Sequence, residues 1–270
     1  MNQTEKSSLY SNLDLMSSEE ILKGINAEDR KVAEAVGGCI PEIARFADAA
    51  VERIRRGGRV FYLGAGTSGR LGILDASEIP PTYGMKGVFI GIIAGGDTAV
   101  RNAVEGAEDD SGQGWKDVLE YNPTPEDCLV GISASGGAPY VVGAVKTARE
   151  CGLLAASISC NEDSPLARVS EIPIIAVVGP EFVTGSTRMK AGTATKLILN
   201  MISTCVMIRL GRVKGSHMVD MQLTNKKLVD RGTRMVMEGT GVTDYDKARE
   251  LLLEHGSVRD VISALNKDKT

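Results

Sequence analysis

Five short apolar runs, separated by segments of helical character, constrain the fold of this chain more than any other feature. The runs lie at residues 60–63, 88–93, 128–132, 154–159 and 174–178. Each run is apolar along its length and does not alternate between apolar and polar residues, which is typical of strands buried on both faces. Strands of this kind, alternating with helices, form parallel sheets. We therefore predict an α/β fold with a five-stranded parallel sheet between two layers of helices.

Further helices are expected on both sides of this series. Two precede it, one beginning near Ser17 and one running from Pro41 to Arg56. Between the strands we expect, among others, a helix from about Arg70 to a stop at Pro80-Pro81. After Gly179 the pattern is almost entirely helical. The helices expected within and after the series include residues 97–106, 139–151, 190–210, 218–237, 245–255 and 258–265.

These patterns divide the chain into three predicted parts. Residues 1–56 form an N-terminal helical segment packed on the core, residues 57–213 form the sheet domain, and residues 214–270 form a C-terminal helical segment.

Composition narrows the classes of function. The net charge of −4 gives no reason to expect binding to nucleic acid or to a membrane surface. The N-terminus is polar and no apolar run approaches the ~20 residues that span a bilayer, so we expect a cytoplasmic protein. The five cysteines are widely spaced and form no Cys-x-x-Cys pair, so we expect neither a disulfide framework nor a metal site.

Two glycine- and hydroxyl-rich turns follow predicted strands and open helices. The first carries Thr67 and Ser68, and the second carries Ser133 and Ser135. Free backbone N–H groups at a helix N-terminus, together with hydroxyls, form a favourable site for a phosphate. The alternative is that Ser and Gly are merely common in strand–helix turns. Because the carboxyl ends of parallel strands meet at one sheet edge, the two turns are expected to converge on one ligand.

Because the chain has only two histidines, carboxylates or lysines with shifted pKa values are the candidates for proton transfer. Glu78 and Glu108 follow the first and second strands, so they could face each other across one pocket. The alternative for Glu108 is that it belongs to a solvated acidic cluster at the end of a helix. Arg188 and Lys190 crowd the start of the helix at 190–210, where cations are unfavourable unless an anion lies between them. The alternative is that both are ordinary surface charges.

Nucleotide-binding classes are disfavoured. The spacing Gly64-x-Gly66-x-x-Gly69 fits a dinucleotide motif, but no acidic residue ends the second strand to hold a ribose. A Gly-Lys-Ser/Thr phosphate loop is also absent from the sequence.

Several longer motifs resemble those of the N-acetylmuramic acid 6-phosphate etherases. The resemblance extends from Thr4-Glu5 to about Ser257, and its motifs lie at residues 64–78, 103–109, 185–193, 199–204, 218–220 and 224–228. It implies the three-layer fold of the sugar isomerase (SIS) family and a cytoplasmic homodimer without metal or organic cofactor. It also implies a lyase of cell-wall recycling, which cleaves N-acetylmuramic acid 6-phosphate to N-acetylglucosamine 6-phosphate and D-lactate.

The resemblance also implies roles for individual residues. Glu108 would remove the proton at C2 of the ring-opened sugar, and Glu78 would protonate the departing lactate oxygen and later activate water. Thr67, Ser68, Ser133 and Ser135 would hold the phosphate. Arg188 and Lys190 would meet the phosphate or the lactyl carboxylate. A threonine that is usual before Pro-Tyr in the family is replaced here by Ala138.

Two alternative functions remain open at this point. The first is a sugar-phosphate-binding regulator without catalysis, which would not need a proton-transfer pair. The second is an aldose–ketose isomerase on the same fold, which would release a ketose and no lactate.

Overall fold

The predicted parallel sheet is confirmed in the computed structural model, which describes residues 3–223 and 225–267. All four strand pairings are parallel, in the order β2-β1-β3-β4-β5. The fifth strand begins two residues earlier than expected and is shorter. The strands are β1 (Val60–Gly64), β2 (Phe89–Ile93), β3 (Cys128–Ile132), β4 (Leu154–Ser159) and β5 (Ile172–Ile175).

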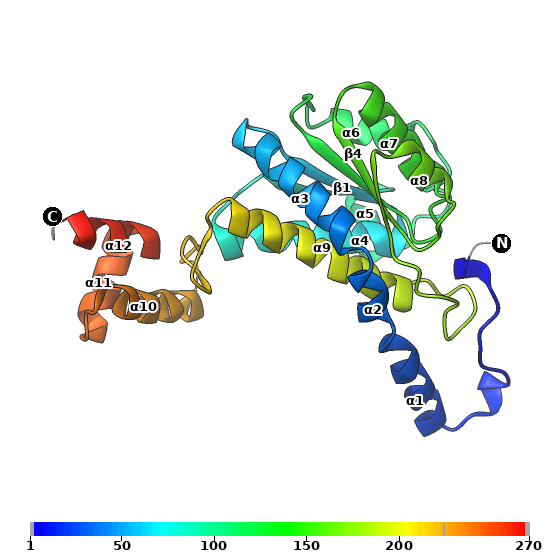
Figure 1. The fold of residues 1–270 in the computed structure, drawn as a ribbon, viewed down its shortest axis with the longest axis horizontal. Helices are drawn as coiled ribbons and strands as arrows, with labels where there is room; N and C mark the ends of the chain where they lie inside the picture. The colour runs from blue at the N-terminus through cyan, green and yellow to red at the C-terminus, as the bar shows by residue number, and fades with distance from the viewer. Residues whose placement is uncertain (1–2, 224, 268–270) are drawn as a thin grey trace. The chain divides into compact units, whose positions relative to one another are not determined.

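Helices cover both faces of this sheet (Figure 1). From β1 the chain passes to β2 at one edge of the sheet. From β2 it returns past β1 to β3, and β4 and β5 follow in the same direction. Right-handed crossovers therefore place α4 on one face and α6 to α8 on the other. On the second face, Phe61 and Leu63 pack in one core cluster with Val141 and Ala144 of α7. The helices are α4 (Gly66–Tyr83), α5 (Gly96–Arg101), α6 (Gln113–Leu119), α7 (Pro139–Glu150) and α8 (Pro165–Val169).

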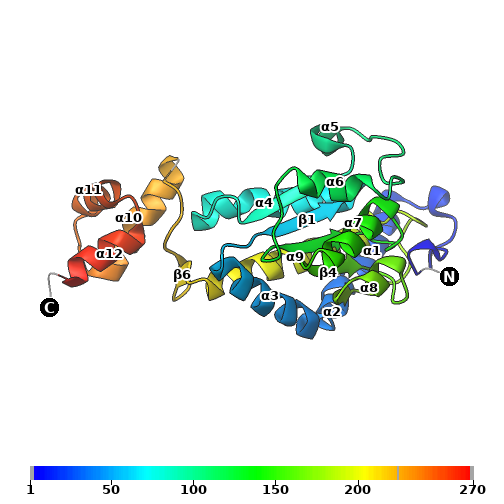
Figure 2. The same cartoon turned by 90° about the horizontal axis from the view of Figure 1, so that it is seen from above.

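The N-terminal part of the chain packs with the sheet in the same compact unit. It contains two short 3-10 helices, η1 (Gln3–Glu5) and η2 (Leu13–Leu15), followed by α1 (Ser18–Asp29), α2 (Val32–Gly37) and α3 (Ile40–Arg55). Ser17 caps α1 by accepting a hydrogen bond from the N–H of Glu20, as its sequence predicts. Helix α3 lies beside α9 (Lys190–Arg209) in both views of the ribbon (Figures 1 and 2).

Helix α9 is long and apolar enough to cross a membrane by length and composition alone. More than half of its apolar window, 56%, is buried inside the protein. Its residues Ile198, Ile202 and Val206 are fully buried. Helix α9 therefore has the character of a core helix.

Three helix predictions were wrong in their bounds. Helix α4 does not stop at Pro80-Pro81 but continues to Tyr83, where the N–H of Gly84 donates to the carbonyl of Pro80 at 3.0 Å. Prolines lack a donor, but their carbonyls still accept helical hydrogen bonds. Helix α5 ends at Arg101, five residues before the predicted end.

The predicted helix at 218–237 begins later, at Lys226. Its start is fixed by Asn225, whose side chain accepts a hydrogen bond from the N–H of Leu228. Residues before it form a small antiparallel hairpin of β6 (Val213–Lys214) and β7 (His217–Met218). The C-terminal helices are α10 (Lys226–Thr240), α11 (Tyr245–His255) and α12 (Val258–Lys267).

Contacts between Cα atoms divide the chain into two compact units. One comprises Met1–Ser77 and Val88–Val206, and the other comprises Glu78–Gly87 and Met207–Thr270. The second unit has its own apolar core, in which Val236, Ala248, Leu252 and Val261 are buried. The three-part division predicted from the sequence stays a prediction.

Candidate functional site

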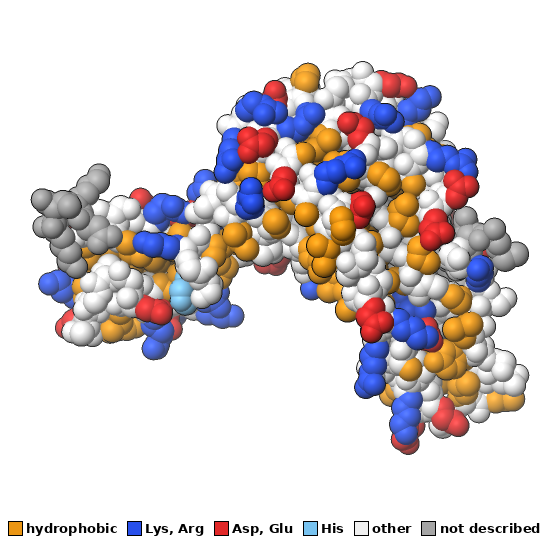
Figure 3. All heavy atoms as spheres, in the orientation of Figure 1, with side chains coloured by type: hydrophobic (Ala, Val, Ile, Leu, Met, Phe, Trp, Pro, Cys, Tyr) orange, Lys and Arg blue, Asp and Glu red, His pale blue; other side chains and the backbone are white. Residues whose placement is uncertain are grey.

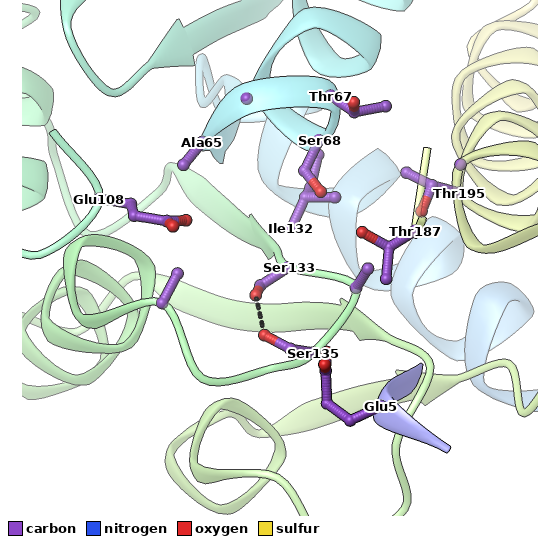
Figure 4. A pocket seen from close by; sticks show the side chains of 14 residues that line it. Glu5, Ala65, Thr67, Ser68, Glu108, Ile132, Ser133, Ser135, Thr187 and Thr195 are labelled. Carbon is purple, nitrogen blue, oxygen red and sulfur yellow. Dashed lines mark hydrogen bonds between the residues drawn. The ribbon is translucent and has the colours of Figure 1, made fainter. Parts of the chain in front are cut away.

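A polar pocket of about 280 Å³ lies beyond the carboxyl ends of β1 and β3 (Figure 4). This is the position at which the strand order of the sheet reverses, where open α/β folds bind their ligands. Its lining combines hydroxyls, two carboxylates and backbone. The side chains with hydroxyl or carboxylate groups are Glu5, Thr67, Ser68, Glu108, Ser133, Ser135, Thr187 and Thr195.

The first wall of the pocket is the N-terminus of α4. The first N–H groups of a helix have no acceptor within the helix, so those of the first turn are available to a ligand. The turn before them is tight: a Cβ on Gly64 would lie 2.7 Å from the backbone nitrogen of Gly69. Gly66 has φ +52°, a conformation that favours glycine. Glycines at these positions therefore bring Thr67 and Ser68 to the pocket.

The second wall is the turn after β3. The Ser133 hydroxyl accepts a hydrogen bond from the N–H of Gly136 at 3.1 Å, and the Ser135 hydroxyl accepts one from Gly137 at 3.2 Å. The two serine hydroxyls lie 3.4 Å apart and both line the pocket. One of these two hydroxyls donates its hydrogen to the other, so the hydrogen of the acceptor hydroxyl remains available to a ligand. Thr67, Ser68, Ser133 and Ser135 all line this one pocket, and their binding of a phosphate stays a prediction.

Glu108 reaches the same pocket from the loop between α5 and α6. Its backbone carbonyl accepts a hydrogen bond from the N–H of Tyr140, at the start of α7, at 2.9 Å. Ala107 packs against the core cluster under α7. The carboxylate of Glu108 lies across the pocket opening from Ser133 and Ser68 (Figure 4). The loop is therefore anchored on both sides of the residue that it presents.

The sequence analysis offered a helix end as one position for the acidic cluster around Glu108. The structure places the cluster elsewhere. Because α5 ends at Arg101, these acids lie in the following loop. Asp110 has a structural role there, since its carboxylate accepts hydrogen bonds from the N–H groups of Gly112 and Gln113. These two bonds lower the pKa of Asp110. Asp110 thus fixes the start of α6, while Glu108 faces the pocket.

Glu78 is not among the residues that line this pocket. It lies in α4 about three turns, or roughly 18 Å, beyond Gly66, at whose end of the helix the pocket opens. Its side chain is exposed. A helix of regular geometry cannot present both its first turn and its fourth to one small pocket. Within one copy of the chain, Glu108 therefore lines the pocket without Glu78.

Arg188 and Lys190 do not line the pocket either. Arg188 is exposed, whereas Lys190 is only 2% exposed and so is no surface charge. The ammonium of Lys190 forms an ion pair with buried Glu28 of α1, with Nζ 2.6 Å from Oε2. The anion expected at the start of α9 is the chain's own Glu181, whose carboxylate accepts hydrogen bonds from the N–H groups of Lys190 and Ala191.

Replacement of Lys190 by Met is expected to destabilise the protein by about 3–5 kcal/mol, because Glu28 would lose a buried partner. Burial acts to raise the pKa of Glu28, but its hydrogen bonds and charge contacts with Lys190 and Lys31 outweigh it and lower the pKa. This contribution to stability is therefore present above the ordinary pKa of Glu and is lost as the pH falls. Urea unfolding at neutral pH measures the effect.

The matched control is Lys23→Met in α1. Lys23 also pairs with a glutamate, Glu19, but both side chains are about three-quarters exposed. Its loss is expected to cost less than about 1 kcal/mol. Equal losses in the two variants would contradict a stabilising role for the buried pair.

The pocket includes residues that the sequence did not single out as ligands. Thr187, Gly192 and Thr195 contribute a third wall, from the start of α9. Thr187 lies in a segment whose hydroxyls were visible in the sequence, where helix capping is the simplest interpretation. Glu5, from η1, had no local signal: its place is decided by contacts with residues more than 150 positions away.

The described residues contain no group of three or more His, Cys, Asp or Glu side chains that could hold a metal ion. The expectation of a reaction without metal or organic cofactor stays a prediction.

Known proteins are similar to this one in sequence over almost the whole chain. Residues 42–149 match the family model of the glucokinase regulatory protein N-terminal SIS domain. An N-acetylmuramic acid 6-phosphate etherase of Bacteroides thetaiotaomicron is 57% identical over 265 residues, which cover 98% of this chain and 95% of the relative. The etherase of Christiangramia forsetii is 59% identical over 267 residues, with coverages of 98% and 97%.

Solved structures share the fold at low identity. A phosphoheptose isomerase from Francisella tularensis superposes with a TM-score of 0.52 at 22% identity and covers 72% of this chain and all of its own. A phosphoheptose isomerase from Neisseria gonorrhoeae gives a TM-score of 0.50 at 19% identity, with coverages of 70% and 98%. The SIS-type architecture predicted from the sequence is thereby confirmed.

Proposed function

This chain belongs to the N-acetylmuramic acid 6-phosphate etherase family, and we propose that the pocket beyond β1 and β3 is the active site of its reaction. The protein is a carbon–oxygen lyase. It cleaves the D-lactyl ether of N-acetylmuramic acid 6-phosphate and gives N-acetylglucosamine 6-phosphate and D-lactate. The observation that supports this location best is the convergence of four hydroxyls, a helix N-terminus and Glu108 on one pocket.

The substrate phosphate is held by neutral donors in this proposal. Among the described residues, no Lys or Arg side chain lines the pocket. The hydroxyls of Thr67, Ser68, Ser133 and Ser135 and the first N–H groups of α4 are all donors that suit a phosphate. The positive end of the α4 dipole adds to their attraction.

Replacement of Ser68 by Ala is expected to raise KM about tenfold and to leave kcat little changed, because one hydrogen bond to the charged phosphate is lost. Ser77→Ala in the same helix is the control, since the Ser77 hydroxyl donates to the carbonyl of Leu74 on the exposed surface. Steady-state kinetics of lactate release compare the two variants. An unchanged KM in Ser68→Ala would contradict this position for the phosphate.

Glu108 acts as the base that removes the C2 proton of the ring-opened sugar. The carbon–hydrogen bond at C2 is acidified by the neighbouring aldehyde, and the electrons released expel lactate from C3. A separate acid must protonate the lactate oxygen, and water then adds at C3. We assign that acid role to Glu78, as the resemblance implies, although Glu78 lies outside the pocket of its own chain.

A homodimer reconciles this assignment with the structure. Leu74 and Glu78 stand four residues apart on α4, so they share one face of the helix. Leu74 is 53% exposed, and Met201 of α9 is 39% exposed. Hydrophobic side chains also gather on another part of the surface, where α3 and α9 lie (Figure 3). We propose that a second copy docks on the face of α4 that carries Leu74 and Glu78, and that Glu78 thereby reaches the pocket of that copy.

Two further assignments concern Arg188, which does not line the pocket, and the location of the protein in the cell. Arg188 extends from the segment that also carries Thr187, so it is the cation best placed to meet the lactyl carboxylate. We place the protein in the cytoplasm, in keeping with a role in recycling cell-wall amino sugars.

A coupled D-lactate assay on N-acetylmuramic acid 6-phosphate tests the proposed function. The expected result is release of equal amounts of D-lactate and N-acetylglucosamine 6-phosphate. An isomerase would give a ketose without lactate, and a regulator would bind the sugar phosphate without turnover. Either outcome would overturn the etherase assignment.

A further inference from the structure

The N-terminal segment, residues 3–10, is tied across the rim of the pocket by hydrogen bonds. Asn161, which follows β4, accepts a hydrogen bond from the N–H of Gln3 at 2.6 Å and donates to the hydroxyl of Thr4 at 3.1 Å. The same Asn161 amide donates to the carbonyl of Ser135 at 2.9 Å, so one side chain joins this segment to the serine turn. Both Thr4 and Asn161 are buried.

A second set of contacts fixes the other end of this segment. The Ser8 hydroxyl donates to the carbonyl of Phe182 at 2.7 Å, and the Ser8 N–H donates to the hydroxyl of Thr184 at 2.9 Å. The ring of Tyr10 packs on Phe182 with centroids 4.7 Å apart. Anchored at both ends, residues 3–10 hold Glu5 in a defined position.

Glu5 is the residue of this segment that lines the pocket. In Figure 4 its carboxylate points towards Ser135, on the side of the pocket away from Glu108. The pocket wall formed by the described residues contains no cation that could neutralise it. A bare anion bound at the hydroxyls would therefore meet a nearby like charge. A ligand with hydroxyl donors beside its phosphate would instead satisfy the carboxylate.

We propose that Glu5 is a specificity-determining residue, which accepts hydrogen bonds from sugar hydroxyls close to the phosphate and disfavours inorganic phosphate. The inference rests on the proposed function, because it takes the ligand to be a sugar 6-phosphate anchored by Ser133 and Ser135. Glu5 has no part in the proton transfers. Its effect is on which phosphate-bearing ligand occupies the pocket.

Titration calorimetry with two ligands, N-acetylglucosamine 6-phosphate and inorganic phosphate, tests this role. In Glu5→Gln, the affinity for the sugar phosphate is expected to fall about 10- to 100-fold, as for loss of a hydrogen bond to a charged group. The affinity for inorganic phosphate is expected to stay the same or to rise, because a like charge has been removed. Glu19→Gln, on the exposed surface of α1, is the matched control and should change neither affinity.

A purely structural role would give a different pattern. Asn161→Ala loosens residues 3–10 and the serine turn together, so it is expected to weaken both ligands. If Glu5→Gln also weakened both equally, or changed neither, the specificity role would be overturned. The binding measurement does not depend on turnover. A wild-type protein that binds the sugar phosphate but releases no lactate would overturn the etherase function and leave the role of Glu5 to be judged by the two affinities.

Discussion

Glu108→Gln is expected to lower kcat for lactate release by about 10²- to 10⁴-fold, the usual contribution of a general base. The amide keeps the size of the side chain but cannot accept the C2 proton. Because the loop is held by the backbone of Glu108 and by Ala107, the substitution should leave the fold and the binding of product intact. Steady-state kinetics and calorimetry with N-acetylglucosamine 6-phosphate separate the two effects.

Isotope exchange identifies the step that is lost. In deuterium oxide the wild type is expected to exchange the C2 hydrogen of the product, and Glu108→Gln is expected not to do so. Glu120→Gln, an exposed glutamate after α6, is the matched control and should behave as the wild type. Exchange at the wild-type rate in Glu108→Gln would assign the base to another residue.

Mixing two inactive variants is expected to restore lactate release. Each of Glu78→Gln and Glu108→Gln alone should be nearly inactive, because each removes one proton-transfer group. If Glu78 serves the pocket of a second copy, a mixed dimer has one pocket with both carboxylates intact. With random exchange of subunits, about a quarter of all pockets would then be complete. The activity of a 1:1 mixture, refolded together from denaturant, should approach that fraction of the wild type.

The outcome distinguishes two arrangements of the acid. If Glu78 acts within its own chain, every pocket of every dimer lacks one carboxylate, and the mixture stays inactive. Size-exclusion chromatography of the same samples shows whether dimers have formed. A dimeric but inactive mixture would therefore contradict the assignment of Glu78 to the partner pocket.

Local sequence was enough to predict the sheet and the two turns that line the pocket. Four of the five strands were placed within a residue or so, because continuous apolar runs bounded by turn residues have few alternatives. Thr67, Ser68, Ser133 and Ser135 were found for a related reason. A hydroxyl-rich turn after a parallel strand is placed at one edge of the sheet by topology alone, before any side-chain contact is known.

The helix ends were less predictable, since weak local preferences compete there with packing. Pro80 and Pro81 usually indicate a helix end, yet α4 continues through them to Tyr83. Helix α10 begins at Lys226, directly after the cap Asn225, although the apolar pattern of the sequence starts earlier.

Only the tertiary structure decided which contacts the charged side chains make, because their partners are distant in the sequence. Lys190 has the pattern of a ligand or a surface charge, but it is buried against Glu28, 162 positions away. Glu5 enters the pocket because Asn161 holds its neighbours. Glu78 lies outside the pocket because a helix advances about 1.5 Å per residue and cannot return to its own first turn. The sequence by itself determined the strands of the sheet and which turns line the pocket. The packing of remote segments determined which charged side chains reach the pocket, because a buried charge takes whichever partner the fold places beside it.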